Sequence, residues 1–161
     1  MAKSASNPVA AAHTAAPRLP VDSSLFFKLV RVVNLTARPF QEGVSKEHHL
    51  SLSEWRVMVV LASHAQIAAT EVVDFSGMDK MSVSRAMAQL DKTGRIVKSA
   101  DPQDQRRTLL SLSAAGRKLY KKIGSAAMLR EAHLFAGMAG SDVQQLDALL
   151  DRLLLALKAQ E

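Results

Sequence analysis

The chain has 161 residues, of which 48% are hydrophobic and only 4% aromatic, and it contains no cysteine. This length suits a single domain, and a core built mainly of Leu, Val, Ala and Met favours helices packed on helices over a β-sandwich. The missing cysteines exclude a disulfide framework, a cysteine-ligated zinc site and a thiol redox switch. No apolar run reaches the roughly 18 residues that a membrane span needs, so we expect a cytoplasmic protein.

The formal net charge of +6 is unevenly distributed. The segment from Lys80 to Lys122 holds 11 Lys and Arg against three Asp, a net of +8, which leaves −2 for the rest of the chain. A basic segment in an otherwise near-neutral protein is typical of a surface that contacts a phosphate backbone. The alternative is a basic face that only water covers.

The N-terminal part combines a low-complexity stretch with one helix. Residues 1–21 are rich in Ala, Ser and Pro, and we expect a disordered tail there rather than a targeting peptide. A helix should be capped near Asp22 and Ser23, and Pro39 should bend or end it. The polar stretch from Gln41 to His49 is expected to be a loop or a frayed continuation of the helix.

A helix-turn-helix pattern occupies the middle of the chain. Ser51 and Glu54 fit the capping box that opens a helix, and the residues after them are apolar nearly all round, as in a buried central helix. A short helix is predicted over Ile67–Ser76, with Gly77 as its stop and Met78-Asp79 as the turn after it. A polar, basic helix is predicted over Lys80–Thr93. Two short helices joined by a tight turn that contains glycine form the helix-turn-helix pattern.

A hairpin and two further helices follow. Arg95–Ala100 and Thr108–Leu112 are predicted strands, and Asp101–Asp104 is the turn between them. Ser113 can cap the next helix, which is expected from Ala114 to about Phe135. A last helix is expected from a second capping-box match at Ser141 onward.

The predicted order of helix, helix, turn, helix and hairpin is that of a winged helix-turn-helix, here from about Leu52 to Leu112. The expected fold class is therefore mainly α with a small β-wing, in which the flanking helices form a helical dimerisation domain. The leucine stripe of the last helix is too hydrophobic for a free surface, and a second copy of the chain would bury it. The expected organisation is a tail (1–21), an N-terminal dimerisation helix and loop (22–50), a DNA-binding lobe (51–113) and C-terminal dimerisation helices (114–161).

The second helix of such a motif enters the major groove, where base edges present distinct donors and acceptors. Arg85 has two possible roles, because it could read a guanine with two hydrogen bonds or pair with a phosphate. Arg106 and Arg107 near the hairpin tip suit a narrow minor groove, although Arg106 could instead form an ion pair with Asp104. The residues at the start of the helix that would face DNA are Lys80, Ser82, Ser84 and Arg85.

Several motifs resemble those of the MarR family of bacterial regulators. Ser82-Val83-Ser84-Arg85 and Leu90-Asp91-Lys92-Thr93-Gly94 are similar to the family's recognition helix. The segment Asp101–Arg107, followed by Leu110–Arg117, resembles its wing and next helix, and Glu54-Trp55-Arg56-Val57 resembles the start of its central helix.

The resemblance covers about residues 22–160 and implies a homodimer that binds a pseudo-palindromic site on double-stranded DNA, usually as a repressor. It also implies that Asp104 and Arg106 are a pair in the wing, with Arg106 reaching the minor groove. The chain departs from the family at Ala68, where a capping Thr is common, and at Met81, where a small polar residue is usual. The residues expected at the DNA are Lys80, Ser82, Val83, Ser84, Arg85, Gln89, Asp104, Gln105, Arg106 and Arg107.

Many members of the resembled family respond to small aromatic acids bound between the dimer helices and the DNA-binding lobe, so an aromatic carboxylate effector is implied here. A His and a nearby Arg could hold its carboxylate or ring hydroxyl. Trp55 could instead be a packing residue, and one of His48 and His49 a solvated side chain. The residues implied at the effector are Arg38, Phe40, His48, His49, Trp55 and Arg56.

Three other functions receive less support from the sequence. No cofactor and no metal are expected, although Glu47, His48 and His49 with distant His133 could be read as the site of a metal-responsive regulator. No His–Ser–Asp order, nucleotide-binding loop or supported pair of carboxylates is present, so an enzyme is not predicted. A winged helix used for protein–protein interaction remains an alternative, against which the clustered charge argues.

Overall fold

The computed structural model describes residues 23–160, and the tail predicted for residues 1–21 lies outside this range. The chain divides into two units, of which the first contains α1 (Leu25–Pro39) and the second runs from Phe40 onward. In α1 the amide of Phe27 donates to Ser24 Oγ at 3.4 Å, so the helix is capped one residue later than predicted. None of the side chains of α1 is buried within its unit.

The second unit begins with the segment for which a loop or frayed helix was expected, and this segment is helical throughout. A π-helical turn, η1 (Phe40–Val44), leads into α2 (Ser45–His48). A wide turn directly after Pro39 has a physical cause, because proline cannot donate the backbone hydrogen bond of a regular helix. The segment is anchored by Phe40, which is 5% exposed, and ends at His49 in the left-handed region.

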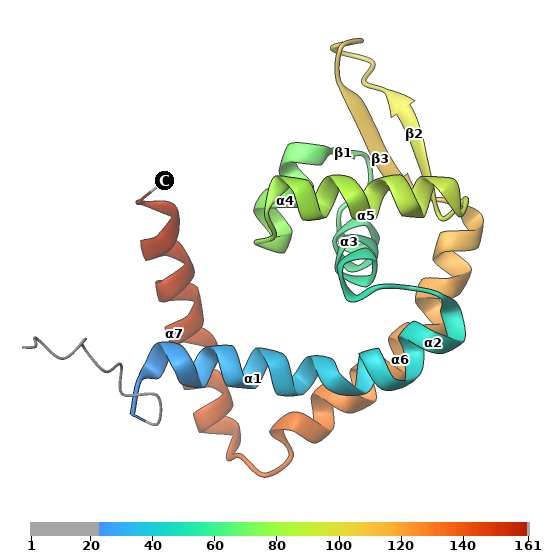
Figure 1. Cartoon of the computed structure of the whole chain (residues 1–161). Coiled ribbons are helices and arrows are strands. Elements are labelled where there is room, and N and C mark those ends of the chain that lie inside the picture. Colours follow the sequence, from blue (N-terminus) through green and yellow to red (C-terminus); the bar gives the residue numbers. More distant parts are fainter. Residues whose placement is uncertain (1–22, 161) are drawn as a thin grey trace, which may run out of the picture. The chain divides into compact units, whose positions relative to one another are not determined.

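The helix-turn-helix and hairpin form the predicted lobe (Figure 1). A three-stranded antiparallel sheet in the order β1-β3-β2 underlies the wing, and the hairpin β2–β3 projects beyond α5. The elements are α3 (Leu52–Ser63), β1 (Ile67–Ala68), α4 (Ala69–Ser76), α5 (Lys80–Lys92), β2 (Ile96–Ala100) and β3 (Thr108–Leu112).

Strand β1 corrects the prediction of a helix that starts at Ile67. Ile67 and Ala68 are extended and pair with Leu110 and Leu109 of β3, and both are buried. The helix begins only at Ala69, where the carboxylate of Glu71 accepts a hydrogen bond from the Ala68 amide at 2.9 Å. Two residues are too short a segment for the alternation that reveals a strand in sequence.

One hydrophobic core joins the helices of the lobe to the sheet. Its largest fully buried side chains come from the end of the α2 segment, α3, α4 and α5, and residues of β2, β3 and α6 complete it. The central members are Leu50, Val57, Met58, Leu61, Val72, Val83, Leu90, Ile96, Leu110, Leu112 and Ile123.

Two long helices follow the hairpin, α6 (Ala114–Phe135) and α7 (Gly140–Lys158). Ser113 caps α6 as the sequence pattern suggests, because its Oγ accepts from the Gly116 amide at 2.9 Å. The capping box predicted at Ser141 is wrong, since α7 starts at Gly140 without a side-chain cap. No helix within residues 23–160 is both long and apolar enough to cross a membrane.

Arg95 connects the end of α5 with the wing, with α6 and with the α2–α3 segment. Its amide donates to the Leu90 carbonyl at 2.8 Å, and its own carbonyl accepts from the Ser113 amide at 3.0 Å. Its guanidinium donates to the His48 carbonyl at 2.7 Å. Nη1 also lies 3.7 Å from Oε2 of the buried Glu54, an electrostatic contact rather than a hydrogen bond.

Gly116 allows α6 to approach this point closely. A Cβ built on Gly116 would overlap the carbonyl oxygen of Arg95, whereas a Cβ on Gly124 of the same helix meets nothing within 4 Å. A backbone atom held by a hydrogen bond from Ser113 cannot move aside without breaking that bond.

We therefore expect Gly116→Ala to lower the free energy of unfolding by about 1–3 kcal/mol, the usual cost of overpacking. Gly124→Ala is the matched control and should leave stability unchanged or raise it by up to about 1 kcal/mol, because alanine is the better helix former. Urea unfolding followed by circular dichroism measures both. Equal stability of the two variants would contradict the close approach at Arg95.

Candidate nucleic-acid interface

The start of α5 is held by a carboxylate that the sequence analysis assigned only to a turn. Asp79 Oδ1 accepts the backbone N–H of Ser82 at 2.8 Å, which makes Asp79 the N-cap. The Ser82 hydroxyl and amide lower the pKa of Asp79, so this carboxylate remains ionised. The signal in the sequence was an Asp directly before a helix and three residues before a Ser.

The buried and exposed faces of α5 are cleanly separated. Val83 is 1% exposed and packs in the core with Ala86 and Leu90, so its side chain does not share the exposed face with the other residues expected at the DNA. Ser82 is half-buried. Up to Gln89, the exposed positions repeat at helical spacing along one face and are Lys80, Met81, Ser84, Arg85, Ala88 and Gln89.

Arg85 lies on this exposed face and is only lightly restrained. Its Nε donates to the carbonyl of Met81, one turn earlier, at 3.3 Å. No acidic side chain within residues 23–160 forms an ion pair with it. The rest of its guanidinium therefore remains available as a donor.

The wing turn is built from two aspartates that bind backbone amides. Asp101 Oδ1 accepts from the Gln103 amide at 2.9 Å, and Asp104 Oδ1 accepts from the Arg106 amide at 3.0 Å. Such Asx turns fix the backbone locally. Asp104 thus holds Arg106 through its main chain, and the side-chain ion pair considered for these two residues is not formed. The Arg106 side chain is exposed, as is that of Gln105.

Arg107 differs from Arg106 because it is engaged within the lobe. Its Nη2 lies 3.2 Å from Glu71 Oε2, and Nη1 lies 3.8 Å from Asp101 Oδ2. The same Oε2 of Glu71 accepts from the Ala68 amide. Glu71, which sequence reasoning did not single out, therefore ties the turn end of the wing to the start of α4.

The cations of the basic segment therefore fall into two groups: those that pair with an acidic side chain and those that do not. Lys98 lies 2.6 Å from Asp91, and Lys122 lies 2.9 Å from Glu47, whose pKa the hydrogen bond from Lys122 lowers. Among the described residues, the cations of the segment that have no acidic partner include Lys80, Arg85 and Arg106, at the start of α5 and in the wing turn.

The expected effector residues are only partly brought together. The ring of the buried Phe40 stacks on Trp55 at a centroid distance of 6.1 Å, and Trp55 stacks on Tyr120 of α6 at 5.4 Å. Arg38 belongs to the unit that contains α1, and Arg56 is half-buried. Of the expected set, Trp55 lines an open groove of about 650 Å³ between α3 and α6.

The two histidines face different surroundings. His48 is half-buried, with Nε2 3.3 Å from Glu47 Oε1, whereas His49 is exposed. Their carbonyl oxygens both accept from the Arg95 guanidinium, at 2.7 and 3.3 Å. Across residues 23–160, no three His, Asp or Glu side chains lie close enough together to hold a metal ion.

Sequence reasoning missed the part of the groove that α6 contributes. Tyr120, Gly124, Ala127 and Glu131 follow one another at helical spacing and line it, together with Lys121, Ser125 and Met128. Small residues between larger ones on one helical face leave room beside the helix. The small residues at this spacing, next to the only tyrosine in the chain, were the signal in the sequence that could have indicated the groove.

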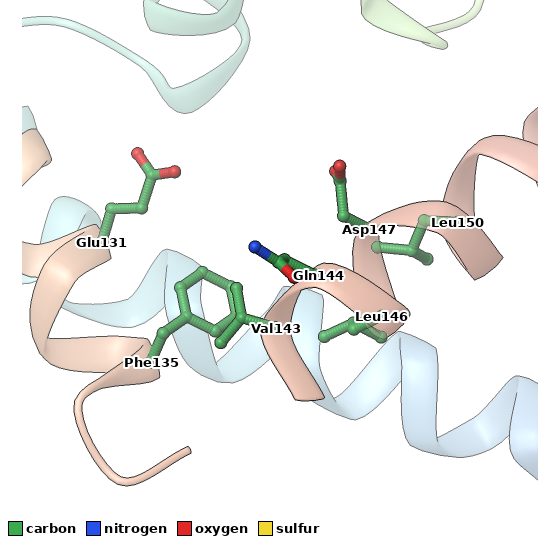
Figure 2. A pocket seen from close by; sticks show the side chains of 7 residues that line it. All are labelled: Glu131, Phe135, Val143, Gln144, Leu146, Asp147 and Leu150. Atoms are coloured by element: carbon green, nitrogen blue, oxygen red, sulfur yellow. The ribbon is translucent and has the colours of Figure 1, made fainter. Parts of the chain in front are cut away.

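A second, smaller groove of about 300 Å³ lies between the end of α6 and α7 (Figure 2). Glu131 and Phe135 reach it from α6, and Gln144 and Asp147 from α7. Apolar side chains of α7 complete its lining: Val143, Leu146 and Leu150.

Comparison with known proteins places this lobe in a family. A sequence profile of the MarR family matches residues 50–108. FarR of Neisseria gonorrhoeae, an HTH-type transcriptional regulator, is 26% identical over 81 residues, which make up 50% of this chain and 56% of FarR. The match thus spans little more than half the length of that relative.

Two solved structures share the fold. A MarR/EmrR family transcriptional regulator from Acinetobacter sp. ADP1 has a TM-score of 0.80 at 23% identity, over 88% of this chain and 99% of that one. BpsR of Bordetella bronchiseptica, whose DNA binding is regulated by 6-hydroxynicotinic acid, has a TM-score of 0.73 at 20% identity, over 85% and 96%. The lobe that contains the winged helix-turn-helix is therefore similar in sequence to the MarR family, and the chain shares its fold with these two regulators.

Proposed function

We propose that the protein is a homodimeric, cytoplasmic repressor that binds a pseudo-palindromic site on double-stranded DNA and is released from it by a small aromatic acid. The observation that carries the DNA-binding part is the exposed face of α5, where Lys80, Ser84, Arg85 and Gln89 present donors with no acidic partner in the described chain. Arg106 adds a free guanidinium at the wing turn. A major-groove helix flanked by a minor-groove wing uses these groups.

Exposed apolar side chains support the dimer. Leu25 and Phe26 of α1 are 72% and 71% exposed, and α7 exposes a row of leucines, among them Leu149, Leu153 and Leu157. Surfaces of this kind are rarely left to water, and a second copy of the chain would cover them. Two-fold symmetry would then set two α5 helices about one DNA turn apart, which matches a pseudo-palindromic site.

DNA binding should depend steeply on salt. Each phosphate that a Lys or Arg neutralises contributes about −0.9 to the slope of log affinity against log salt concentration. We expect preferred duplexes selected from a random pool to be bound far more tightly than scrambled ones, with a slope that reflects several phosphates. Fluorescence anisotropy at several salt concentrations measures both. A flat salt response, or equal affinity for every duplex, would favour the protein-interaction alternative.

Replacing Arg85 and replacing Arg106 should change DNA binding in different ways. Arg85→Ala should reduce affinity for the preferred duplex by about 1–3 kcal/mol and relax discrimination at one base pair, if the contact is bidentate. Arg106→Ala should weaken binding to all duplexes and lower the salt slope by about one. Arg152→Ala removes a guanidinium from the exposed surface of α7 and is the control. Unchanged binding by Arg106→Ala would show that the hairpin is not a DNA-contacting wing.

The groove beside Trp55 supports the effector part of the proposal. Its aromatic wall of Trp55 and Tyr120 suits a flat ring, and Lys121 supplies a positive charge for a carboxylate. The side chains of His48 and His49 are an alternative site for the carboxylate. Their backbone carbonyl oxygens already accept hydrogen bonds from Arg95. The regulation of BpsR by 6-hydroxynicotinic acid sets the ligand class to test first.

Trp55 is the only tryptophan, so its fluorescence reports on the groove directly, without DNA. We expect an aromatic carboxylate such as 6-hydroxynicotinate or 4-hydroxyphenylacetate to change this fluorescence and to release DNA over the same concentration range. Gly124→Leu should fill the groove and raise the ligand Kd at least about tenfold while DNA binding persists. His48→Ala and His49→Ala are the comparisons. Loss of the response in these variants, and not in Gly124→Leu, would move the site to the histidines.

A further inference from the structure

Met81 is the exposed residue of α5 whose chemistry differs most from that of its neighbours. Its side chain is 64% exposed, and it is the only large hydrophobic residue of this helix that is exposed to this degree. The apolar positions Val83, Ala86 and Leu90 all turn into the core. Met81 instead lies on the face that carries Lys80, one helical turn before Arg85.

The local contacts fix where this side chain lies. Asp79 caps the helix at 2.8 Å from the Ser82 amide, so Met81 is in the first turn, at the end that enters the groove. The Arg85 Nε bond to the Met81 carbonyl, at 3.3 Å, holds Arg85 over the same turn. Because Lys80 and Arg85 beside Met81 are cationic, and Asp79 is engaged in the helix cap, a polyanionic partner fits this face better than a basic or neutral protein surface.

The major groove offers one apolar group, the 5-methyl group of thymine, and apolar side chains discriminate thymine by contact with it. Methionine is unbranched and polarizable, so it adapts to such an irregular surface. We infer that Met81 is a specificity-determining residue that selects a thymine by packing on its 5-methyl group, next to the position read by Arg85. This inference rests on the proposed DNA-binding function.

The test uses deoxyuridine, which lacks only the methyl group of thymidine. In the selected duplex, each thymine is replaced singly, and affinity is measured by anisotropy with the full chain. The wild-type protein should bind about three- to fivefold more weakly when one particular thymine in each half-site is replaced, as expected for the loss of one buried methyl group. The Met81→Ala variant should lose this sensitivity at that position, while the effect of deoxyuridine at every other position should stay as in the wild type.

Two further variants keep the result interpretable. Met81→Leu retains an apolar side chain and should retain the sensitivity. Met138→Ala removes a methionine that is 41% exposed between α6 and α7 and should leave the whole profile as in the wild type. Identical deoxyuridine profiles of the wild type and Met81→Ala would overturn the inference while leaving sequence-specific DNA binding intact. If the wild-type protein discriminates no duplex at all, the proposed function fails, and the inference with it.

Discussion

Arg95 lies where the recognition helix ends, the wing begins and α6 starts, and its contacts hold these elements together. The main chain of Arg95 bonds to Leu90 on one side and to Ser113 on the other. Its guanidinium reaches the carbonyls of His48 and His49 and lies beside the buried carboxylate of Glu54. Hydrogen bonds to charged groups contribute about 1.5–3 kcal/mol each, so this cluster outweighs the exposed ion pairs of the lobe, which contribute about 0–1 kcal/mol.

The consequence is that α5 and the wing keep a fixed position relative to each other within the lobe. The wing is anchored at its base by Arg95 and near its turn by the Arg107–Glu71 pair, and its turn is shaped by Asp101 and Asp104. Arg106 is the one arginine of the turn left to contact a partner. Trp55 follows Glu54 in the first turn of α3, so the groove and the base of the wing share that turn. Under the proposed function, a ligand that moves Trp55 therefore acts beside the residue that holds Arg95.

Much of this lobe could be predicted because its signals are local. Caps at Ser51 and Ser113, the glycine stop at Gly77 and the alternation in Thr108–Leu112 each depend on a few adjacent residues, and each was confirmed. The features that sequence reasoning missed are those that a partner distant in the sequence decides. Ile67 and Ala68 are extended because β3 pairs with them, and Arg107 is engaged because the fold brings Glu71 to it from 36 positions away. Tyr120 is placed against Trp55 only by the packing of α6 on α3.

The central claim is that α5 and the wing turn form the DNA-binding surface, and amide chemical-shift mapping by NMR tests it most directly. A labelled sample of the full chain would be titrated with its preferred duplex at moderate salt. We expect the largest changes in Lys80–Gln89 and Asp104–Thr108, with little change in the groove residues near Tyr120 and Gly124. Changes concentrated along α6 and α7, with the α5 and wing amides unaffected, would contradict it.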